Sequence, residues 1–209
     1  MESSTLLYFL LASVLLTLAP GPDNMYLLAK SLASGAKSGI ALTCGLASGI
    51  LFHTSLVILG VAALIQSSPM ALHALQYMGA AYLLYLAWGA FHASGNLRIA
   101  NADSSASCKA LYKRGVLMNV LNPKVLLFFL AFLPQFVNLS HPSANLHIAL
   151  LGFIFAMQAL VIFSAIALCA GHVRKYILHV KNLGQIFGRI EGSVLTLIAL
   201  TLLLGNLND

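Results

Sequence analysis

The sequence contains very little charge for its length. Of its 209 residues, 8% are charged and 60% are hydrophobic, whereas an ordinary soluble domain carries about 25% charged residues. This scarcity excludes a soluble globular domain and predicts an all-α integral membrane protein that crosses the bilayer several times. The formal net charge of +6 is therefore interpreted as a topology signal and not as a surface that binds nucleic acid.

Several functional signatures are also missing. No glycine-rich loop ends in Gly-Lys-Ser or Gly-Lys-Thr, so we expect no ATPase site in this chain. The N-terminal segment has Glu2 in place of a basic region and lacks a small-residue cleavage pattern, which argues against a cleavable signal. The three cysteines cannot pair evenly and are expected to be free thiols, and the seven histidines show no metal-ligand spacing. We therefore expect neither a metal nor another cofactor.

Long apolar runs predict six membrane-spanning helices, because a hydrocarbon core of about 30 Å requires about 20 apolar residues per helix. The predicted spans cover residues 5–29, 39–65, 70–92, 112–137, 146–170 and 185–205. Ten of the eleven basic residues then lie in or beside loops on one side of the membrane. They are Lys30, Lys37, Arg98, Lys109, Lys113, Arg114, Arg174, Lys175, Lys181 and Arg189. The positive-inside rule makes that side cytoplasmic and places both termini on the other side.

The longest loop, residues 93–111, divides the six predicted spans into two groups of three. Because each half has an odd number of spans, the two halves have opposite orientations, as in the inverted repeats of many secondary transporters. We therefore predict one transporter domain over residues 1–209, with half-repeats over residues 1–95 and 110–209 joined by the cytoplasmic loop. Assembly into a homo-oligomer is left open.

A backbone break interrupts the first predicted span, where Pro-Gly-Pro occupies residues 20–22 and Asp23 follows. The prolines have no N–H group, so the carbonyls of Leu16 and Leu18 lose their helical partners. A carboxylate beside free carbonyls inside a bilayer is costly, and such groups typically mark a substrate or ion pathway. The break is therefore predicted to form half of a transport site.

A second break interrupts the fourth predicted span at Asn122-Pro123, directly before Lys124. Pro123 cannot donate to the carbonyl of Asn119, and Asn followed by Pro is typical of an N-cap and the first turn of a new helix. Each break lies 15 residues from the outer end of its span. At 1.5 Å per residue, both are about 22 Å deep. We therefore expect the two breaks to face each other.

The two breaks carry opposite charges, Asp23 and Lys124. A cation in the first turn of a helix opposes the helix dipole, so Lys124 requires an anionic partner, either Asp23 or a substrate carboxylate. Asp23 and free carbonyls suit an ammonium group, so the site as a whole suits a zwitterion such as an amino acid. The alternative is that the two side chains pair only with each other and hold the helices together. The predicted substrate-binding residues are Pro20, Gly21, Pro22, Asp23, Asn24, Asn119, Asn122, Pro123 and Lys124.

The second predicted span contains two small-residue motifs, at residues 35–39 and 45–49, and a histidine, His53. Such glycine motifs let helices approach closely, and we expect them to pack within the monomer more than between subunits. His53 lies four residues after the second motif, on the same face. With an unperturbed pKa of about 6.5, it is a candidate for a proton relay together with Asp23; the alternative is a hydrogen-bonded packing role.

The remaining polar and aromatic side chains in the spans are weaker candidates. Tyr82, Tyr85 and Trp88 are interpreted as packing or interfacial aromatics, and Gln158 is a modest site candidate in a long apolar run. Glu191 is expected to lie near the start of the sixth span, where a carboxylate suits a helix N-terminus, so we assign it a structural role.

These motifs resemble the lysine exporter (LysE) superfamily, and within it the homoserine/threonine-resistance (RhtB) branch of amino-acid exporters. The resemblance extends over nearly the whole chain, and its most specific part is the block from Asn122-Pro123-Lys124 to Pro134-Gln135-Phe136. The other residues that carry it are 19–24, Gly39, Gly45, Gly49, His53, 79–86, Arg114, Gly115 and 119–121. The resemblance implies a multi-pass carrier of the bacterial inner membrane that exports amino acids or close metabolites and is driven by ion gradients.

Residues and resemblance together predict a secondary-active exporter of amino acids or related zwitterions, and not an enzyme. The expected partners are the amino-acid substrate and the lipid bilayer, without nucleic acid. Two alternatives remain open: an integral-membrane enzyme that uses Asp23 and His53 as acid and base, or a passive channel that uses the same polar site.

Overall fold

A computed structural model describes residues 3–67, 69–93, 106–177 and 182–205, and these residues form helices and short connections without a strand. The α-helices are α1 (Ser3–Leu18), α2 (Pro22–Ser34), α3 (Ala36–Ser67), α4 (Pro69–Phe91), α5 (Cys108–Val120), α6 (Pro123–Leu127), α7 (Ala144–Ile177) and α8 (Leu183–Gly205). A π-helix, η1 (Phe128–Phe132), and a 3₁₀-helix, η2 (Leu133–Phe136), follow α6.

The chain is an α-helical integral membrane protein. Within the part of the chain that the structure describes, three stretches are long and apolar enough to cross a bilayer: Ala36–Gly60, Ala144–Ala170 and Gly184–Leu204. Two bent helix pairs raise the number to five when each pair is counted as one span, with bends of 57° between α1 and α2 and 51° between α5 and the segment Pro123–Phe136. The third predicted span, residues 70–92, corresponds to α4, which is about 34 Å long at 1.5 Å for each of its 23 residues. It is not among these five stretches, so the sixth crossing stays a prediction.

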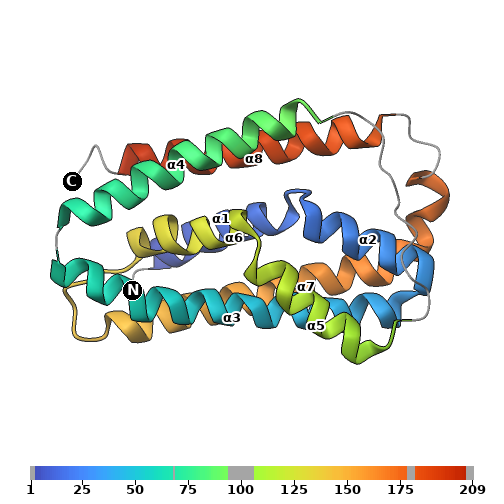
Figure 1. Cartoon of the computed structure of the whole chain (residues 1–209), viewed down its shortest axis with the longest axis horizontal. Helices are drawn as coiled ribbons and strands as arrows, with labels where there is room; N and C mark the ends of the chain where they lie inside the picture. The colour runs from blue at the N-terminus through green and yellow to red at the C-terminus, as the bar shows by residue number, and fades with distance from the viewer. Residues whose placement is uncertain (1–2, 68, 94–105, 178–181, 206–209) are drawn as a thin grey trace.

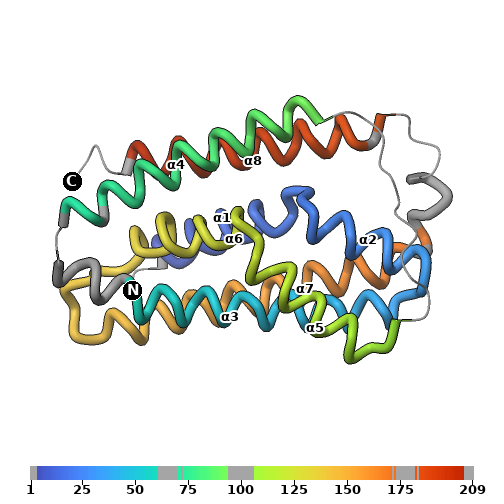
Figure 2. The backbone as a smooth tube through the Cα atoms, in the orientation of Figure 1, coloured from blue at the N-terminus to red at the C-terminus, as the bar shows by residue number. Residues whose placement is uncertain are grey.

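The helices lie roughly parallel to one long axis (Figures 1 and 2). In the view of Figure 1, α4 and α8 lie side by side along the top, α1 and α6 occupy the middle, and α3, α5 and α7 form the lower layer. Helix α1 begins and α8 ends at the end of the molecule where α4 and α7 begin, and the junction of α2 with α3 lies at the opposite end. Arg98 and Lys181 of the predicted cytoplasmic loops lie outside the described residues.

The breaks in α1–α2 and α5–α6 occur where the prolines predict them. The backbone of Gly21 is extended, with φ −134° and ψ −176°, and Pro22 begins α2. In the second break, the side chain of Asn122 accepts a hydrogen bond from the Lys124 N–H at 3.0 Å, and Pro123 occupies the first turn of α6. Asn122 is therefore an N-cap, as the sequence indicates.

Two local predictions are wrong. Lys30 was expected in a loop, but α2 continues to Ser34 and Lys30 is fully buried within it. Gly35 was expected in a helix-packing motif, but its φ of +82° terminates α2, a conformation that favours glycine. The structure also shows that α6 is followed by a π-helix and then by a 3₁₀-helix that contains Pro134.

The glycines of α3 bring it into close contact with neighbouring helices of the same chain. A Cβ atom on Gly45 would overlap the backbone carbonyl of Tyr112 in α5, and one on Gly115 would overlap the backbone carbonyl of Leu42. Gly49 faces the side chain of Asn119 in the same way. Small residues thus let α3 and α5 touch backbone to backbone, which fixes the position of the second break.

Gly45→Ala is expected to lower the melting temperature of the detergent-solubilised protein. The added methyl group meets backbone, which cannot rotate away, and overpacking of this kind costs about 1–3 kcal/mol. Gly89→Ala in α4 is a matched control, because a Cβ there would meet no atom within 4 Å. The control should be neutral or stabilise the helix by about 0.5–1 kcal/mol. Equal melting temperatures for the two variants would contradict the close packing of α3 and α5.

Candidate functional site

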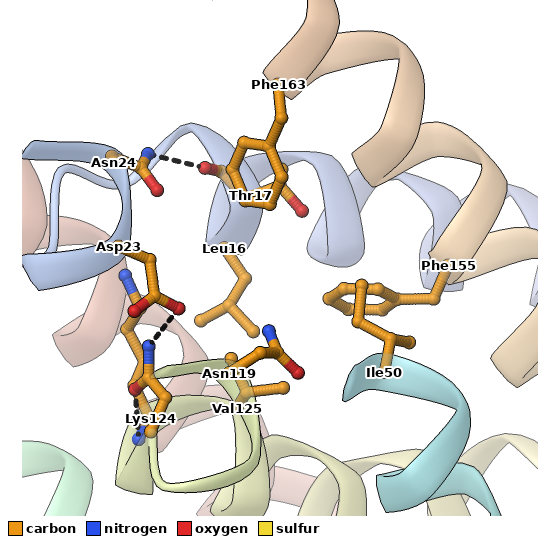
Figure 3. A pocket seen from close by; sticks show the side chains of 11 residues that line it. Leu16, Thr17, Asp23, Asn24, Ile50, Asn119, Lys124, Val125, Phe155 and Phe163 are labelled. Carbon is orange, nitrogen blue, oxygen red and sulfur yellow. Dashed lines mark hydrogen bonds between the residues drawn. The ribbon is translucent and has the colours of Figure 1, made fainter. Parts of the chain in front are cut away.

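The two breaks meet in the structure (Figure 3). The Asn122 side-chain amide donates a hydrogen bond to Asp23 Oδ2 at 2.7 Å, and Lys124 Nζ donates to the Ala19 carbonyl at 3.0 Å. Each break therefore supplies a polar side chain to the other. Asp23, Asn122 and Lys124 are all buried. The facing arrangement expected from their equal depths is confirmed.

The carbonyls freed at the first break are bound by Asn24. Its amide nitrogen donates to the Thr17 carbonyl at 2.8 Å and to the Ala19 carbonyl at 3.3 Å. Pro20 and Pro22 cannot donate to the carbonyls of Leu16 and Leu18. The two carbonyls that Asn24 binds are those of the residues that follow them. Leu16 contributes its side chain to the site.

The carboxylate nearest to the Lys124 ammonium group is not that of Asp23. Its Nζ lies 3.6 Å from Glu191 Oε1 of α8, while Asp23 is hydrogen-bonded to Asn122. Glu191 was expected near the start of a helix, and this placement is wrong. The helix α8 begins at Leu183, so Glu191 lies more than two turns inside it and reaches the second break. The alternative in which Asp23 and Lys124 simply pair with each other is not the arrangement observed.

His53 occupies the other side of the second break. Its Nε2 lies 3.0 Å from the Asn119 carbonyl, which also accepts from the Asn122 N–H at 2.9 Å. A carbonyl oxygen only accepts, so Nε2 carries the hydrogen and donates it. The imidazole is fully buried and packs against the ring of Phe129, with ring centroids 5.8 Å apart. This geometry corresponds to the hydrogen-bonded packing role that the sequence left open.

A small cavity of about 20 Å³ lies between the breaks. It is large enough for about one water molecule and too small for an amino acid. In Figure 3, Asp23, Asn24 and Lys124 lie on one side, and the apolar side chains lie on the other with Thr17 and Asn119 among them. The lining residues are Leu16, Thr17, Asp23, Asn24, Ile50, Asn119, Asn122, Lys124, Val125, Phe155 and Phe163. The site is therefore closed in this structure.

One polar atom of the cavity lining is buried without a hydrogen-bond partner among the described residues. This is Oδ1 of Asn119, whose side chain is 2% exposed. A buried acceptor without a donor is costly and typically marks a place where a further group binds. Together with the Asp23 carboxylate, it gives the cavity two acceptors suited to a donor such as an ammonium group.

Two larger cavities flank the closed site. One, of about 940 Å³, lies among α1, α4, η2 and α8, and Gln76, Gln135 and Asn138 contribute to its lining. The other, of about 270 Å³, is mostly apolar and is lined by α2, α7 and α8 together with Leu18 and Pro20 of the first break. Asn24 lines both this apolar cavity and the closed site.

The predicted site residues divide into two groups. Asp23, Asn24, Asn119, Asn122 and Lys124 line the closed cavity. The others shape the backbone around it: Pro20, Gly21, Pro22 and Pro123. Sequence reasoning missed the residues that line the cavity from neighbouring helices, because apolar side chains in a membrane helix give no signal of which ones face a site. These are Leu16, Thr17, Ile50, Val125, Phe155 and Phe163.

The structure also shows where the weaker site candidates lie. Gln158 donates to Thr17 Oγ1 at 2.8 Å, and thus supports a residue of the lining without lining the cavity itself. Tyr82, Tyr85 and Trp88 are exposed on α4, away from the site. The three cysteines are free, and among residues 3–67, 69–93, 106–177 and 182–205 no cluster of three or more metal-ligating side chains occurs.

Comparison with known proteins finds one matching family and several similar membrane proteins. The profile of the family described as LysE type translocator matches residues 14–206. The chain is 30% identical over 200 residues to an uncharacterized membrane protein, YrhP, of Bacillus subtilis (strain 168), covering 91% of this chain and 94% of the relative. It is 28% identical over 185 residues to the leucine efflux protein of Salmonella typhimurium (strain LT2), covering 88% and 87%. No solved structure matches.

Proposed function

Because this chain belongs to the LysE type translocator family, we propose that it is a secondary-active exporter of amino acids. It is a multi-pass protein of the bacterial inner membrane. The observation that carries the proposal is the meeting of two broken helices, which brings one buried carboxylate and one buried ammonium group to the lining of one cavity. Buried charges inside a membrane protein are costly and typically mark the path of a substrate.

The two charges suit the two ends of a zwitterion. Asp23 and the unpartnered Oδ1 of Asn119 are acceptors for a substrate ammonium group, and Lys124 Nζ is a donor for its carboxylate. Asp23 and Lys124 each lie in the first turn of a helix, directly after a break. A shift of either helix half would therefore enlarge the cavity without unfolding a regular helix.

The apolar side of the cavity favours an amino acid with an apolar side chain. Leu16, Ile50 and Val125 lie there together with two aromatic rings, those of Phe155 and Phe163. A charged or long polar side chain would lose its hydration against these residues without gaining a partner. Since one relative is a leucine efflux protein, we propose leucine and similar aliphatic amino acids as the substrates of this chain.

We propose transport by alternating access within a single domain of six spans. Along α1 and α2, the closed site lies between the cavity of about 940 Å³, which the earlier part of α1 lines, and the apolar cavity of about 270 Å³ near the first break. Opening toward one of them at a time would carry substrate from one side to the other. In this proposal the two halves form an inverted repeat and both termini lie outside.

Proton antiport through Asp23 is the proposed source of energy. A proton and a substrate ammonium group compete for the same carboxylate, so a proton bound from outside would release the amino acid there. We propose no role for His53 in this step, because its Nε2 donates to the Asn119 carbonyl and its side chain does not line the closed cavity.

Flux of labelled amino acids through proteoliposomes tests the proposed function. We expect saturable transport of leucine, isoleucine and valine, slower transport of lysine and aspartate, and faster leucine efflux when the receiving side is acidic. Liposomes without the protein give the background. Absence of any saturable flux would contradict the proposal, and flux proportional to leucine concentration at all concentrations would identify a channel instead.

A further inference from the structure

Glu191 is a carboxylate that reaches the site from a helix outside both breaks. It belongs to α8, which packs mainly along α4, and its Oε1 lies 3.6 Å from Lys124 Nζ. The Lys124 side chain is 7% exposed and that of Glu191 is 20% exposed. The contact therefore connects the interior of the site with a helix that contributes no residue to the closed cavity.

Gly21 of the first break leaves room for this contact. A Cβ atom on Gly21 would lie 2.8 Å from Lys124 Nζ and 3.1 Å from Glu191 Oε1. Any larger residue would have to displace the lysine or the glutamate. The absence of a side chain at position 21 thus lets a lysine from α6 and a glutamate from α8 meet against the first break.

The pair is an ion pair without a close hydrogen bond. Its separation of 3.6 Å is longer than the 2.7–2.9 Å typical of hydrogen bonds between ammonium and carboxylate groups. The short hydrogen bond of Lys124 Nζ goes instead to the Ala19 carbonyl, at 3.0 Å. A substrate carboxylate that bound Lys124 directly would therefore make a shorter contact than Glu191 does.

We propose that Glu191 is an internal stand-in for the carboxylate of the substrate. In the empty carrier it neutralises Lys124, and in the loaded carrier the carboxylate of the amino acid takes its place. This inference rests on the proposed function. It gives Glu191 a role in the return of the empty carrier, a step that is separate from substrate binding.

The empty and loaded carriers have different requirements in an alternating-access cycle. Both must pass through a closed state, in which an unpaired lysine ammonium would be buried at high cost. Bound substrate supplies the anion in the loaded carrier, and Glu191 supplies it in the empty one. Exchange of substrate for substrate uses only the loaded carrier, whereas net efflux also requires the empty carrier to return. Loss of Glu191 should therefore slow net efflux and spare exchange.

Glu191→Gln in proteoliposomes tests this separation with labelled L-leucine as the probe. We expect net efflux into leucine-free buffer to fall by about tenfold or more, which is about 1.4 kcal/mol on the rate-limiting barrier. The rate of leucine–leucine exchange should stay within about twofold of the wild-type rate. Leucine should also bind more tightly, because no carboxylate competes for Lys124. Glu191→Asp should restore part of the net efflux.

Arg189→Gln is the matched control, because Arg189 is exposed on the same helix and loses its charge in the same way. It should change neither rate. Equal reduction of exchange and net efflux in Glu191→Gln, or no change in either, would overturn the inference while wild-type transport still supports the proposed function. Failure of both Glu191→Gln and Glu191→Ala to fold would show that Glu191 is structural, which also overturns it. If the wild type carries no leucine, the proposed function itself fails.

Discussion

Asp23→Asn is expected to reduce leucine efflux by about 10- to 100-fold while the protein remains folded. The substitution keeps the size of the side chain and leaves an oxygen that can accept the hydrogen bond from Asn122, seen at 2.7 Å in the wild type. The substitution removes the negative charge that, in our proposal, binds the substrate ammonium group. Hydrogen bonds to charged groups are worth about 1.5–3 kcal/mol, which corresponds to this range of rates.

Leucine flux in proteoliposomes and the melting temperature in detergent are the two measurements for this variant. Because asparagine resembles a permanently protonated aspartate, the remaining flux should no longer increase when the receiving side is acidified. The exposed Tyr85→Phe on α4 removes one polar group away from the site and serves as the control. Wild-type flux with a normal response to acid would refute the role of Asp23.

Lys124→Met is expected to cause the larger loss, at least about 100-fold. It removes the proposed donor for the substrate carboxylate, its hydrogen bond to the Ala19 carbonyl, and the partner of Glu191. Removing one member of a buried ion pair costs about 3–5 kcal/mol, because the other charge is left uncompensated. Exchange and net efflux should both be lost, unlike the outcome expected for Glu191→Gln.

Lys113→Met provides the matched control for this experiment. Lys113 lies in α5, the other half of the same bent helix pair, and its side chain is exposed. The same substitution there should leave leucine exchange and net efflux near wild-type values. If Lys113→Met and Lys124→Met change the rates of exchange and net efflux equally, Lys124 has no special function in transport.

The backbone breaks could be predicted from the sequence because their causes are local. Proline removes a helical donor wherever it stands, and Asn122 followed by Pro123 forms an N-cap without help from the rest of the fold. Equal helix lengths predict that the two breaks lie at one depth. The contact between them depends on how the helices pack.

The partners of the charges could not be predicted, because they depend on tertiary packing. Glu191 is distant in sequence from Lys124, and only the placement of α8 against the breaks joins them. Lys30 looked like a loop residue, since nothing near it in sequence shows that α2 continues to Ser34. Phe155 is one of many apolar residues in α7, and periodicity does not separate a lining residue from one that faces lipid.

The most direct test of the proposed site is the binding of leucine and of two truncated analogues to purified protein, measured by calorimetry. One analogue, 4-methylpentanoate, lacks the ammonium group, and the other, 3-methylbutylamine, lacks the carboxylate. The wild type should bind leucine more tightly than either. Asp23→Asn should no longer distinguish leucine from 4-methylpentanoate, and Lys124→Met should no longer distinguish leucine from 3-methylbutylamine. Unchanged discrimination in both variants would contradict a site in which the two breaks hold opposite ends of an amino acid.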